Sequence, residues 1–479
     1  MGLLLIFKFK FMKIINKILI NLSFLFAIIG CGDDRLDINP TDRVGINSAN
    51  KNESTLESVK NGIYYKLAND EVFGRDVIVA GDLLSDDSFV SVKNSNRFTT
   101  LNIMDYSESS NDIYPIDYLY DAYNQANVVI NTTLPETSNV KQMKAEAYAA
   151  KALVLFYAVN LYSPSIASGL YQDYGVPIYS TNYDPNLKYP RSTIAEVYDE
   201  IERNSLQALS LFQNEPSSKQ FLGPTAVKLL LSRSYLFQQK WQKAYNYAVE
   251  VENMSGSLFQ FVNKADYPTY FYTNNAPETV FELGYSQNNS PQINHIAGVY
   301  AIDGAYKQNE FRQSLYDIYD ASDIRKTMYV YDSKNIGNNI IKGYFTKKYT
   351  IANEYSQSIK IFRMTEAKLN KIEALYHLGN ESQALAELNA FVATRGIYTY
   401  SSTGTQLLND ILKERRLEFA AEGYRFFDLK RNMLPINKVT NCSACTVLPT
   451  DKKFVLPMPQ WEIINNPKME QYPEYKYKK

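Results

Sequence analysis

The sequence has few of the residues on which enzyme and metal centres most often depend. Among its 479 residues are two tryptophans, three cysteines and two histidines, His295 and His377. Two histidines almost exclude a catalytic or metal centre built on imidazole. No nucleophile motif or activated pair of carboxylates stands out either. The sequence therefore predicts a protein that is not an enzyme and that uses neither a metal nor a cofactor.

An excess of charge of one sign is also missing. Lysine and arginine total 50 against 51 aspartate and glutamate residues, which leaves a net charge of −1. Proteins that bind nucleic acid carry a basic surface, so the composition argues against a nucleic-acid partner. Beyond residue 30, no apolar run approaches the length of a membrane-spanning helix. We therefore expect the body of the chain to fold outside the membrane.

The long apolar run lies near the N-terminus. Lys13 and Lys17 precede a mostly apolar stretch, 18–29, and Gly30 and Cys31 follow it directly. This order of basic, apolar and small residues is typical of a secretory signal. The final four residues, Ile-Ile-Gly-Cys, resemble the lipobox of bacterial lipoproteins, in which the cysteine is acylated and becomes the new N-terminus.

The N-terminal segment therefore predicts a lipid anchor. We expect residues 1–30 to be a signal peptide and Cys31 to carry the lipid. Two or more acyl chains hold a protein stably on a membrane, whereas one chain does not. The alternative is an unmodified Cys31 behind an ordinary secretory signal. Met12 is an alternative start, because the first eleven residues only repeat a basic and apolar block.

The two remaining cysteines, Cys442 and Cys445, form a single Cys-x-x-Cys pair. One such pair supplies half of a tetrahedral thiolate site, and no histidine lies nearby to complete it. In an exported protein a short local disulfide is the better interpretation. Because it closes a very small loop, we expect it to add little to the stability of the whole protein.

Helical periodicity dominates what the sequence does contain. Apolar residues recur at helical spacing in four early segments, 55–67, 116–130, 140–162 and 193–212. Two later segments, 234–244 and 374–384, resemble each other: an apolar helix ends, a polar turn follows, and a second helix begins. This pattern is typical of tetratricopeptide-type helix pairs. The fourth helix opens with Thr193 and Glu196, which fit a capping box.

A loop-rich region interrupts the helices. Residues 255–359 contain many Tyr, Asn, Gly and Ser, with short strands expected at 279–283 and 344–349. Another loop-rich stretch is expected at 69–112. The chain has 39 tyrosines, whose rings can stack on sugars or peptides but can equally fill helix interfaces. The fold class is therefore mainly α, with helix pairs as a scaffold and a loop-rich insertion that carries short strands.

Several motifs, in chain order, resemble the SusD/RagB family of outer-membrane nutrient-uptake lipoproteins. The most specific is the segment 414–431, which reads Glu-Arg-Arg-Leu-Glu-Phe-Ala-Ala-Glu-Gly-Tyr-Arg-Phe-Phe-Asp-Leu-Lys-Arg. The resemblance covers the whole mature chain and implies a SusD-like fold with regions at 31–254, 255–359 and 360–479. The turn at 162–169 is longer than is usual in the family. The other segments that carry the resemblance are 62–64, 123–131, 145–157, 174–178, 191–199, 362–374, 388–396 and 456–467.

The charges of the 414–431 segment have an interpretation of their own. On a helix, Arg415 and Glu418 are three residues apart and can pair. Glu414 and Glu418 share a face and need a cation between them, for which Arg425, Lys430 and Arg431 are candidates. Such a dense cluster beside aromatic residues is more often a network that holds a fold together than a catalytic site.

The family resemblance implies a function in nutrient capture. It implies a lipid-anchored protein in the outer membrane that faces the cell exterior, an orientation with which the acidic residues Asp33 and Asp34 agree. It implies a lid over a SusC-like TonB-dependent β-barrel transporter, and binding of an oligosaccharide without bond making. One alternative is a member of the family that binds peptides. Another is an envelope scaffold lipoprotein with helical repeats and no role in transport.

The family's ligand contacts do not transfer by motif, because they lie where its sequences differ most. We expect them in the two loop-rich regions, where binding residues are commonly carried on a rigid scaffold. The tryptophans are not candidates, since Trp241 opens a repeat helix and Trp461 lies in the closing Pro-rich segment. Each candidate contact has a structural or plainly exposed role as its alternative. The candidates are Tyr270, Tyr272, Asn274, Tyr285, Tyr306, Asp86 and Asp87.

Overall fold

The structure is a computed structural model that describes residues 50–91, 93, 97–256, 258–336, 339–352, 354–440 and 442–476. The described residues all belong to one compact unit. Within the described ranges, no helix is long and apolar enough to cross a membrane. The predicted signal peptide, 1–30, and the predicted lipid site Cys31 lie outside the described residues.

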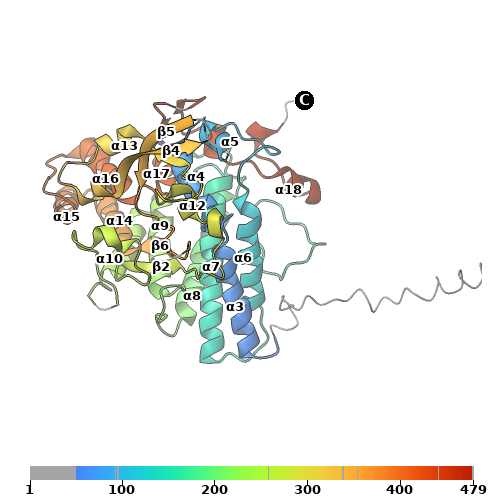
Figure 1. Cartoon of the computed structure of the whole chain (residues 1–479). Coiled ribbons are helices and arrows are strands. Elements are labelled where there is room, and N and C mark those ends of the chain that lie inside the picture. Colours follow the sequence, from blue (N-terminus) through green and yellow to red (C-terminus); the bar gives the residue numbers. More distant parts are fainter. Residues whose placement is uncertain are drawn as a thin grey trace, which may run out of the picture. The chain divides into compact units, whose positions relative to one another are not determined.

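Helices dominate the unit, as the sequence predicts (Figure 1). In chain order they are α3 (Glu53–Leu67), α4 (Asp76–Leu83), α5 (Thr99–Ile103), α6 (Pro115–Ile130), α7 (Ser138–Tyr162), α8 (Ile194–Leu211), α9 (Pro224–Phe237), α10 (Trp241–Glu252), α11 (Tyr267–Tyr270), α12 (Ile296–Tyr300), α13 (Gln313–Asp317), α14 (Met364–His377), α15 (Glu381–Ala393), α16 (Gly404–Phe419), α17 (Arg425–Arg431) and α18 (Gln460–Asn465). Short 3-10 turns are η2 (Ile166–Ser168), η3 (Gln292–Asn294), η4 (Ile324–Met328), η5 (Lys452–Phe454) and η6 (Pro473–Tyr475).

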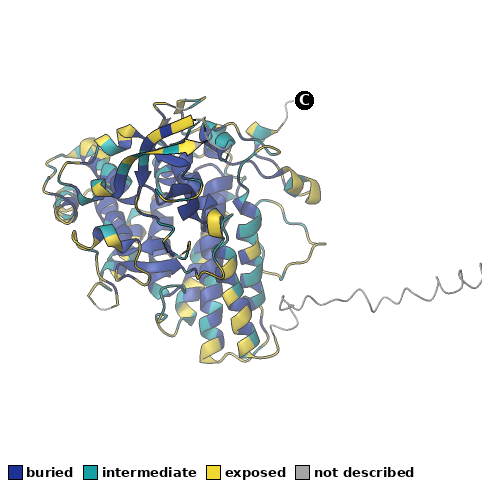
Figure 2. Cartoon of the chain, in the orientation of Figure 1, coloured by how far each residue is buried: buried dark blue, intermediate teal, exposed yellow. Residues whose placement is uncertain are grey.

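The four predicted early helices are confirmed as α3, α6, α7 and α8. The capping box of α8 is also present, because Thr193 Oγ1 accepts from the backbone N of Glu196 at 3.1 Å and Glu196 Oε2 accepts from the backbone N of Thr193 at 2.8 Å. α3, α6 and α7 pack side by side (Figure 1). Every residue of α7 from 149 to 162 is buried, and its alanines let the neighbouring helices approach closely (Figure 2).

The two tetratricopeptide-type pairs are confirmed as α9–α10 and α14–α15, and they pack together through α10 and α14. Ala244 and Ala384 occupy the same place in each pair and are fully buried. A small side chain there allows close contact, since Ser232 Oγ of α9 donates to the backbone O of Ala244 on α10 at 2.9 Å. The packing of small residues at these positions explains why the two segments resemble each other in sequence.

The strands form small antiparallel sheets. They are β1 (Ser88–Val90), β2 (Thr279–Leu283), β3 (Asn309–Phe311), β4 (Tyr329–Ile336), β5 (Asn339–Thr346), β6 (Ile359–Arg363), β7 (Ile436–Asn437) and β8 (Thr446–Val447). The largest sheet has the order β1-β3-β5-β4, while β2 pairs with β6 and β7 with β8. The strand predicted at 279–283 is β2, and the one predicted at 344–349 overlaps the end of β5.

The first sheet joins the two loop-rich regions. Ser88 of β1 pairs with Phe311 of β3, and the backbone N of Arg312 donates to Asp87 O at 2.9 Å. The stretch predicted as loop at 69–112 also contains α4. All eight residues of α4 are buried, so the helix has no polar face and lacks the periodicity by which the other helices were predicted.

A disulfide joins Cys442 and Cys445 in the segment between β7 and β8. The two residues are three apart in the chain, so the bond closes a very small loop.

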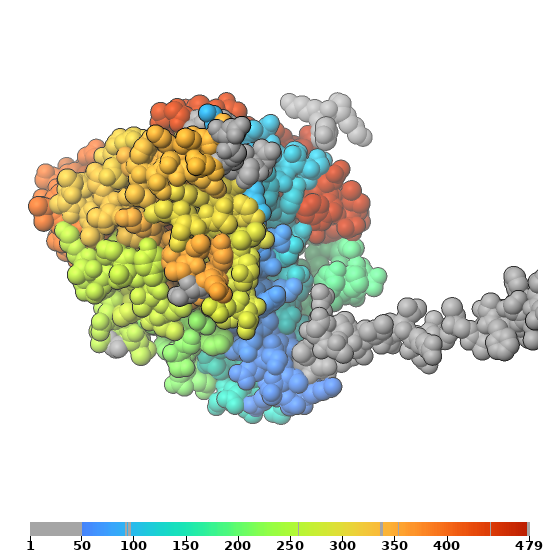
Figure 3. All heavy atoms as spheres, viewed as in Figure 1, coloured from blue at the N-terminus to red at the C-terminus, as the bar shows by residue number. Residues whose placement is uncertain are grey.

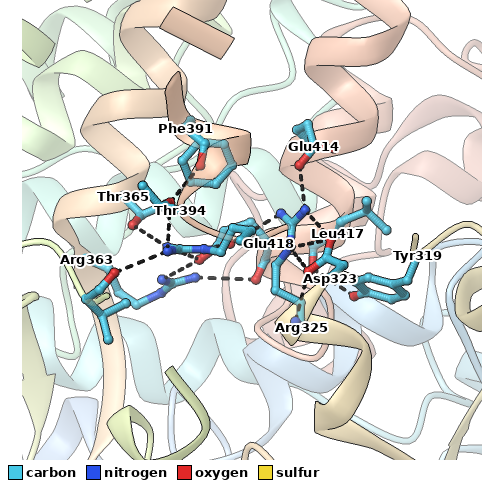
Figure 4. A network of polar contacts seen from close by, with 12 residues as sticks. Tyr319, Asp323, Arg325, Arg363, Thr365, Phe391, Thr394, Glu414, Leu417 and Glu418 are labelled. Carbon is cyan, nitrogen blue, oxygen red and sulfur yellow. Dashed lines mark hydrogen bonds and ion pairs between the residues drawn. The ribbon is translucent and has the colours of Figure 1, made fainter. Parts of the chain in front are cut away.

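The glutamates and arginines of the 414–431 segment lie on α16 and α17, except Glu422, which lies between the two helices. All of them are buried except Arg416 and Arg425, which are partly exposed. Arg415 and Glu418 do not pair with each other, which corrects the expectation from their spacing. Arg415 instead donates to Asn370 Oδ1 at 2.8 Å and lies 3.3 Å from Asp428. The carboxylate of Glu418 lies 3.0 Å from Arg363, 3.0 Å from Arg395 and 3.4 Å from Arg325 (Figure 4).

The cations around Glu418 come from η4, β6 and the segment after α15, and not from α17 as the sequence suggested. Arg425 pairs with Asp86 at 2.7 Å, and Arg431 pairs with Asp428 at 2.7 Å. Lys430 donates to three backbone carbonyls, those of Asn160, Ser163 and Phe454, at 2.6–2.7 Å. We call the buried ion pairs around this carboxylate the Glu418 network, and they connect four distant parts of the chain.

Electrostatics keeps Glu418 ionised in this interior. Burial by itself would raise its pKa, but Arg395, Arg363 and Arg325 outweigh burial and hold the pKa well below the usual range of a glutamate. A buried carboxylate with three guanidinium partners is fully compensated, and it has no capacity left for a ligand.

Candidate functional site

A cavity of about 580 Å³ opens between α3 and the segment that follows β2. In Figure 3 the blue surface of α3 meets the yellow surface of this segment. We call it the amide cavity, because amide side chains are its commonest lining group. Its lining residues are Asn61, Tyr64, Tyr65, Ala68, Asn69, Asp70, Gln220, Phe221, Leu283, Gly284, Tyr285, Asn288, Asn289, Ser290, Pro291 and Asn294.

One wall of the amide cavity is the exposed face of α3. Asn61, Tyr65 and Asn69 are spaced four residues apart, so they follow one another along the same side of the helix and just beyond its end. The opposite side of α3 is apolar and packs into the core. Tyr65 is 66% exposed although its ring is large and apolar. An exposed aromatic ring on a polar helix face, at the edge of a cavity, is available for stacking.

The opposite wall begins where β2 ends. The backbone N of Glu282 donates to Lys219 O at 2.9 Å, which holds the 219–221 segment against the strand. A Cβ atom on Gly284 would lie 2.2 Å from Cδ of Gln220, so only glycine leaves room for the Gln220 amide here. The Tyr285 hydroxyl donates to Ala68 O at 2.6 Å and thereby ties this wall to the end of α3.

Hydrogen bonds fix the loop that closes this wall. Asn289 Oδ1 accepts from the Ser286 hydroxyl at 2.9 Å, and the Ser290 hydroxyl donates to Tyr355 O at 2.8 Å. His295 lies behind the loop, where its ring meets that of Tyr285 edge-on at 4.7 Å. Burial lowers the pKa of His295 to about 4, so this side of the cavity carries no imidazolium charge at neutral pH.

A shelf of charged and aromatic groups adjoins the cavity. The Arg97 guanidinium lies 3.8 Å from the centre of the Tyr306 ring and donates to the Tyr306 hydroxyl at 2.8 Å. The same guanidinium donates to Asn294 Oδ1, at 3.2 Å, and Asn294 lines the cavity. Arg97 therefore connects the early loop-rich region to the 283–294 wall.

Several polar groups of the amide cavity have no partner of their own. The side-chain amides of Asn61, Gln220 and Asn288 and the hydroxyl of Tyr65 make no hydrogen bond with any other described residue. Each amide can both donate and accept. Asp70 is the charged residue among the described lining residues, and Arg75 neutralises it at 2.8 Å. The cavity thus offers hydrogen bonds and an aromatic face rather than charge.

A second cavity, of about 560 Å³, lies between α6, the loop after α7 and α18. Four tyrosines line it, so we call it the tyrosine cavity. The loop after α7 protrudes beside α6 in Figure 1. The lining residues are Lys66, Ile116, Asp117, Tyr120, Asp121, Asn124, Gln125, Pro177, Tyr179, Tyr183, Asp184, Leu187, Lys188, Tyr189, Met458, Glu462, Asn465, Asn466 and Met469.

Two family models match the chain in succession. The model described as "Starch-binding associating with outer membrane" matches residues 34–236, and the model described as "SusD family" matches residues 303–475. The chain belongs to the SusD family.

Curated relatives and solved structures agree with this membership. SusD-like protein P2 of Formosa agariphila is 23% identical over 92% of this chain and 96% of its own length. SusD-like protein P38 of the same organism is 33% identical, but over only 25% of each chain. A SusD superfamily protein of Bacteroides thetaiotaomicron has a similar fold, with a TM-score of 0.79, 24% identity, and coverage of 88% of this chain and 99% of that one.

A further structure with the SusD-family fold contains a ligand. It is surface glycan-binding protein A of Bacteroides thetaiotaomicron in complex with laminarihexaose. Its TM-score is 0.70 at 17% identity, and the match covers 87% of this chain and 99% of that one. At this identity the likeness concerns the fold alone.

Two of the predicted ligand contacts of this SusD-family chain lie at or beside the amide cavity. Tyr285 lines it, although most of its ring is buried, and Tyr306 lies on the adjoining shelf. Tyr272 and Asn274 do not line it. The Tyr272 hydroxyl donates to Lys347 O, and Asn274 Oδ1 accepts from the backbone N of Ser358 at 3.2 Å.

The other three predicted contacts are buried, which corrects the expectation that they face a ligand. Asp86 lies 2.7 Å from Arg425, and Asp87 lies 2.6 Å from Arg416. The Tyr270 hydroxyl shares a hydrogen bond of 3.1 Å with Thr279 Oγ1 in the interior. The two aspartates stand in a loop-rich stretch of the sequence, but arginines more than 300 residues later in the chain cover them.

The sequence interpretation predicted none of the lining residues except Tyr285, and the missed residues with unpartnered polar groups are Asn61, Tyr65, Gln220 and Asn288. Tyr65 carries a usable signal, because a tyrosine on the polar face of an amphipathic helix needs an explanation other than core packing. Asn61 could be predicted only from its four-residue spacing to Tyr65, which places the two side chains on the same side of the helix. Gln220 and Asn288 stand in ordinary loop sequence, and only the fold brings them to the cavity.

Proposed function

We propose that this SusD-family chain is a cell-surface lipoprotein that captures an oligosaccharide in the amide cavity and delivers it to a SusC-like TonB-dependent transporter. The observation that carries the proposal is the set of unpartnered amides around the exposed ring of Tyr65. A sugar presents an apolar ring face for stacking and a rim of hydroxyls that donate and accept. The neutral lining matches an uncharged ligand of this kind.

The complex of a similarly folded protein with laminarihexaose supports a glycan as the ligand class. The proposed role is binding without bond making. The lipid on Cys31 would hold the protein to the outer membrane, facing the cell exterior, where it acts as the lid of the transporter. The family description of association with the outer membrane agrees with this location.

Titration calorimetry of the mature chain against neutral oligosaccharides tests the site, with the laminari-, cello- and malto- series as ligands. We expect Tyr65→Ala to weaken binding by about 1–3 kcal/mol, roughly 5- to 150-fold in Kd, because it removes a stacking face. Asn288→Ala should cost about 0.5–1.5 kcal/mol for a lost hydrogen bond.

The matched control is Tyr331→Ala, which removes a tyrosine of similar exposure, 58%, from β4. Equal losses for Tyr65→Ala and Tyr331→Ala would contradict the amide cavity as the site.

A peptide is the second candidate ligand, since unpartnered amides can also bind a peptide backbone. Uncharged, capped peptides in the same calorimetric panel distinguish the two classes. Tighter binding of the peptides, lost in Tyr65→Ala, would keep the site and replace the ligand.

Two further experiments test the anchor and the partner. Cys31→Ala should release the folded protein from the membrane fraction, and its retention there with the signal cleaved would contradict the lipid anchor. Affinity purification from the native membrane should recover a β-barrel transporter. Recovery of envelope-assembly proteins without a transporter would favour the scaffold alternative.

A further inference from the structure

We infer that the tyrosine cavity is a second binding site, and that it takes a lysine or arginine side chain presented by a peptide segment. The inference does not depend on the proposed function of the amide cavity. The two cavities have no lining residue in common.

Stacked tyrosines form one wall of the tyrosine cavity. The rings of Tyr179 and Tyr189 lie parallel, with centres 4.6 Å apart and an angle of 13° between their planes. The ring of Tyr120 lies 6.1 Å from that of Tyr179 at 29°. Aromatic faces carry negative potential and attract organic cations placed over them.

Hydrogen bonds hold these rings in place before any ligand arrives. The Tyr120 hydroxyl donates to Pro177 O at 2.6 Å, and the Tyr179 hydroxyl donates to Asn124 Oδ1 at 2.7 Å. Asn466 donates to Tyr189 O at 2.8 Å and fixes the far end of the loop against the segment after α18. The site is therefore ordered in advance, which reduces the entropic cost of binding.

The charges of the lining residues are unbalanced. Four carboxylates line the cavity against two lysines, and Lys66 is already paired with Asp121 at 2.8 Å. Asp117 accepts from the indole N–H of Trp461 at 2.9 Å through Oδ2, while its buried Oδ1 has no partner among the described residues. The Glu462 carboxylate makes no ion pair within the described part of the chain.

The environment of these two carboxylates agrees with a missing cation. Burial raises the pKa of Asp117 to about 6, and the neighbouring charge of Glu462 adds to the rise. Burial also raises the pKa of Glu462, although Lys188 opposes it. A positive charge bound between the tyrosines and these carboxylates would favour their ionised forms.

Other ligand classes fit the tyrosine cavity less well. A neutral sugar would stack on the rings but would leave Asp117 and Glu462 without a counter-charge. No group of three or more carboxylate, thiol or imidazole ligands gathers anywhere in the described residues, so the lining does not match a metal site. At the mouth Tyr183 and Leu187 are 59% and 47% exposed, and they offer apolar contact to the residues that flank a basic side chain in a peptide.

The fluorescence of Trp461 reports on this site directly. Its indole bonds to Asp117, while the second tryptophan, Trp241, stacks on His377 at 3.8 Å on the α9–α10 and α14–α15 side of the fold. A Trp241→Phe variant of the mature chain would leave Trp461 as its single tryptophan.

Capped pentapeptides with lysine, arginine or norleucine between pairs of alanines are the probes. We expect saturable changes in Trp461 emission with the lysine and arginine peptides. Binding of the norleucine peptide should be at least tenfold weaker, because it keeps the aliphatic stem and loses the charge.

Variants of the mature chain, measured by calorimetry with the lysine peptide, assign the contacts. Asp117→Asn keeps an acceptor for Trp461 and removes the charge, and Tyr189→Leu removes a ring face. Each should weaken binding at least tenfold. Glu462→Gln, at a partly exposed position, provides a second test if either of these variants fails to fold.

The control is Asp173→Asn, which removes an exposed carboxylate from the same loop outside the cavity and should leave Kd unchanged. Tyr65→Ala should also leave it unchanged, so failure here is separate from failure at the amide cavity. Equal affinity for the norleucine peptide, an unaffected Glu462→Gln variant, or a response of Trp461 to neutral oligosaccharides alone would each overturn the inference.

Discussion

The Glu418 network and the amide cavity use polar side chains in opposite ways. In the network, one buried carboxylate has three arginine partners, and the arginines come from three separate segments of the chain. In the cavity, Asn61, Gln220 and Asn288 have no side-chain partner among the described residues. Buried polar groups that are fully satisfied specify one structure, whereas unsatisfied groups at a surface remain available to a ligand. The completeness of the hydrogen bonding therefore distinguishes scaffold from site better than polarity does.

Glycines show the same contrast. A Cβ atom on Gly81 of α4 would lie 1.9 Å from the backbone O of Gly423, which itself has a φ of +77°. A Cβ atom on Gly284 would lie 2.2 Å from the end of the Gln220 side chain. The backbone at Gly423 could move away from a Cβ atom on Gly81 only if α4 and the segment before α17 shifted apart. The flexible Gln220 side chain could instead rotate away from a Cβ atom on Gly284. Close packing is thus obligatory in the scaffold and adjustable at the cavity.

Acid should produce the largest effect and should act on the scaffold. Burial raises the pKa values of the buried carboxylates, but neighbouring arginines outweigh burial at four of them. The pKa values of Glu418, Glu373 and Asp428 lie below their ordinary ranges, and that of Asp86 is about 2. Groups with lowered pKa values stabilise the fold above their unfolded values, about 3.9 to 4.3, and lose that contribution as the pH falls further. Urea midpoints measured from pH 7 to pH 2 should fall steeply below about pH 4.3.

Glu418→Gln should have the next largest effect. It keeps the shape of the side chain but leaves three buried arginines without their shared carboxylate, so we expect a loss of about 3–5 kcal/mol in the free energy of unfolding. Glu57→Gln on the exposed face of α3 is the control, with an expected change below about 0.5 kcal/mol. Urea denaturation of both variants measures the difference, and similar values would remove the distinction between the two regions.

Replacement of glycine by alanine should lower stability at Gly81 and ligand affinity at Gly284. Gly81→Ala should destabilise the fold by about 1–3 kcal/mol or more through overpacking, which thermal unfolding would measure. Gly284→Ala should change stability by less than about 1 kcal/mol but displace the Gln220 amide, and so weaken ligand binding severalfold in calorimetry. If Gly284→Ala bound ligand normally, Gln220 would not belong to the site.

Loss of the disulfide should have the smallest effect. The Cys442–Cys445 bond closes a loop of only a few residues, so the double variant Cys442→Ser, Cys445→Ser should lose no more than about 2 kcal/mol. Thermal unfolding with and without a reductant gives the value. Ligand binding should not change, because neither cysteine lines the amide cavity. A larger loss would mean that the β7–β8 segment supports the core.

The sequence predicts features that depend on the spacing of neighbouring residues. It misses features that depend on which distant segments the fold brings together. Apolar periodicity correctly located α3, α6, α7 and α8, and the repeat of 234–244 at 374–384 correctly indicated two helix pairs. α4 was not predicted, because a helix that is buried on every side does not show the alternation of apolar and polar residues. Amphipathic helices can thus be predicted from short stretches of the sequence.

Partners of charged groups could not be predicted in the same way. Arg425 was a candidate partner of Glu418 because it is close in the chain, yet it pairs with Asp86, more than 300 residues away. Asp87, another predicted ligand contact, is covered in the same way by Arg416. The amide cavity combines α3 with the 283–294 segment, and no local pattern in either stretch indicates the other.

The pairing of β1 with β3 has a consequence for sequence changes in the two loop-rich regions. The register of Ser88 with Phe311 and of Val90 with Asn309 joins the early loop-rich region to the later one. An insertion within either strand would shift that register by a residue and turn the side chains beyond it to the opposite face of the sheet. Replacing one loop-rich region without the other would leave β1 or β3 without the matching strand, whereas replacing both together would preserve the pairing.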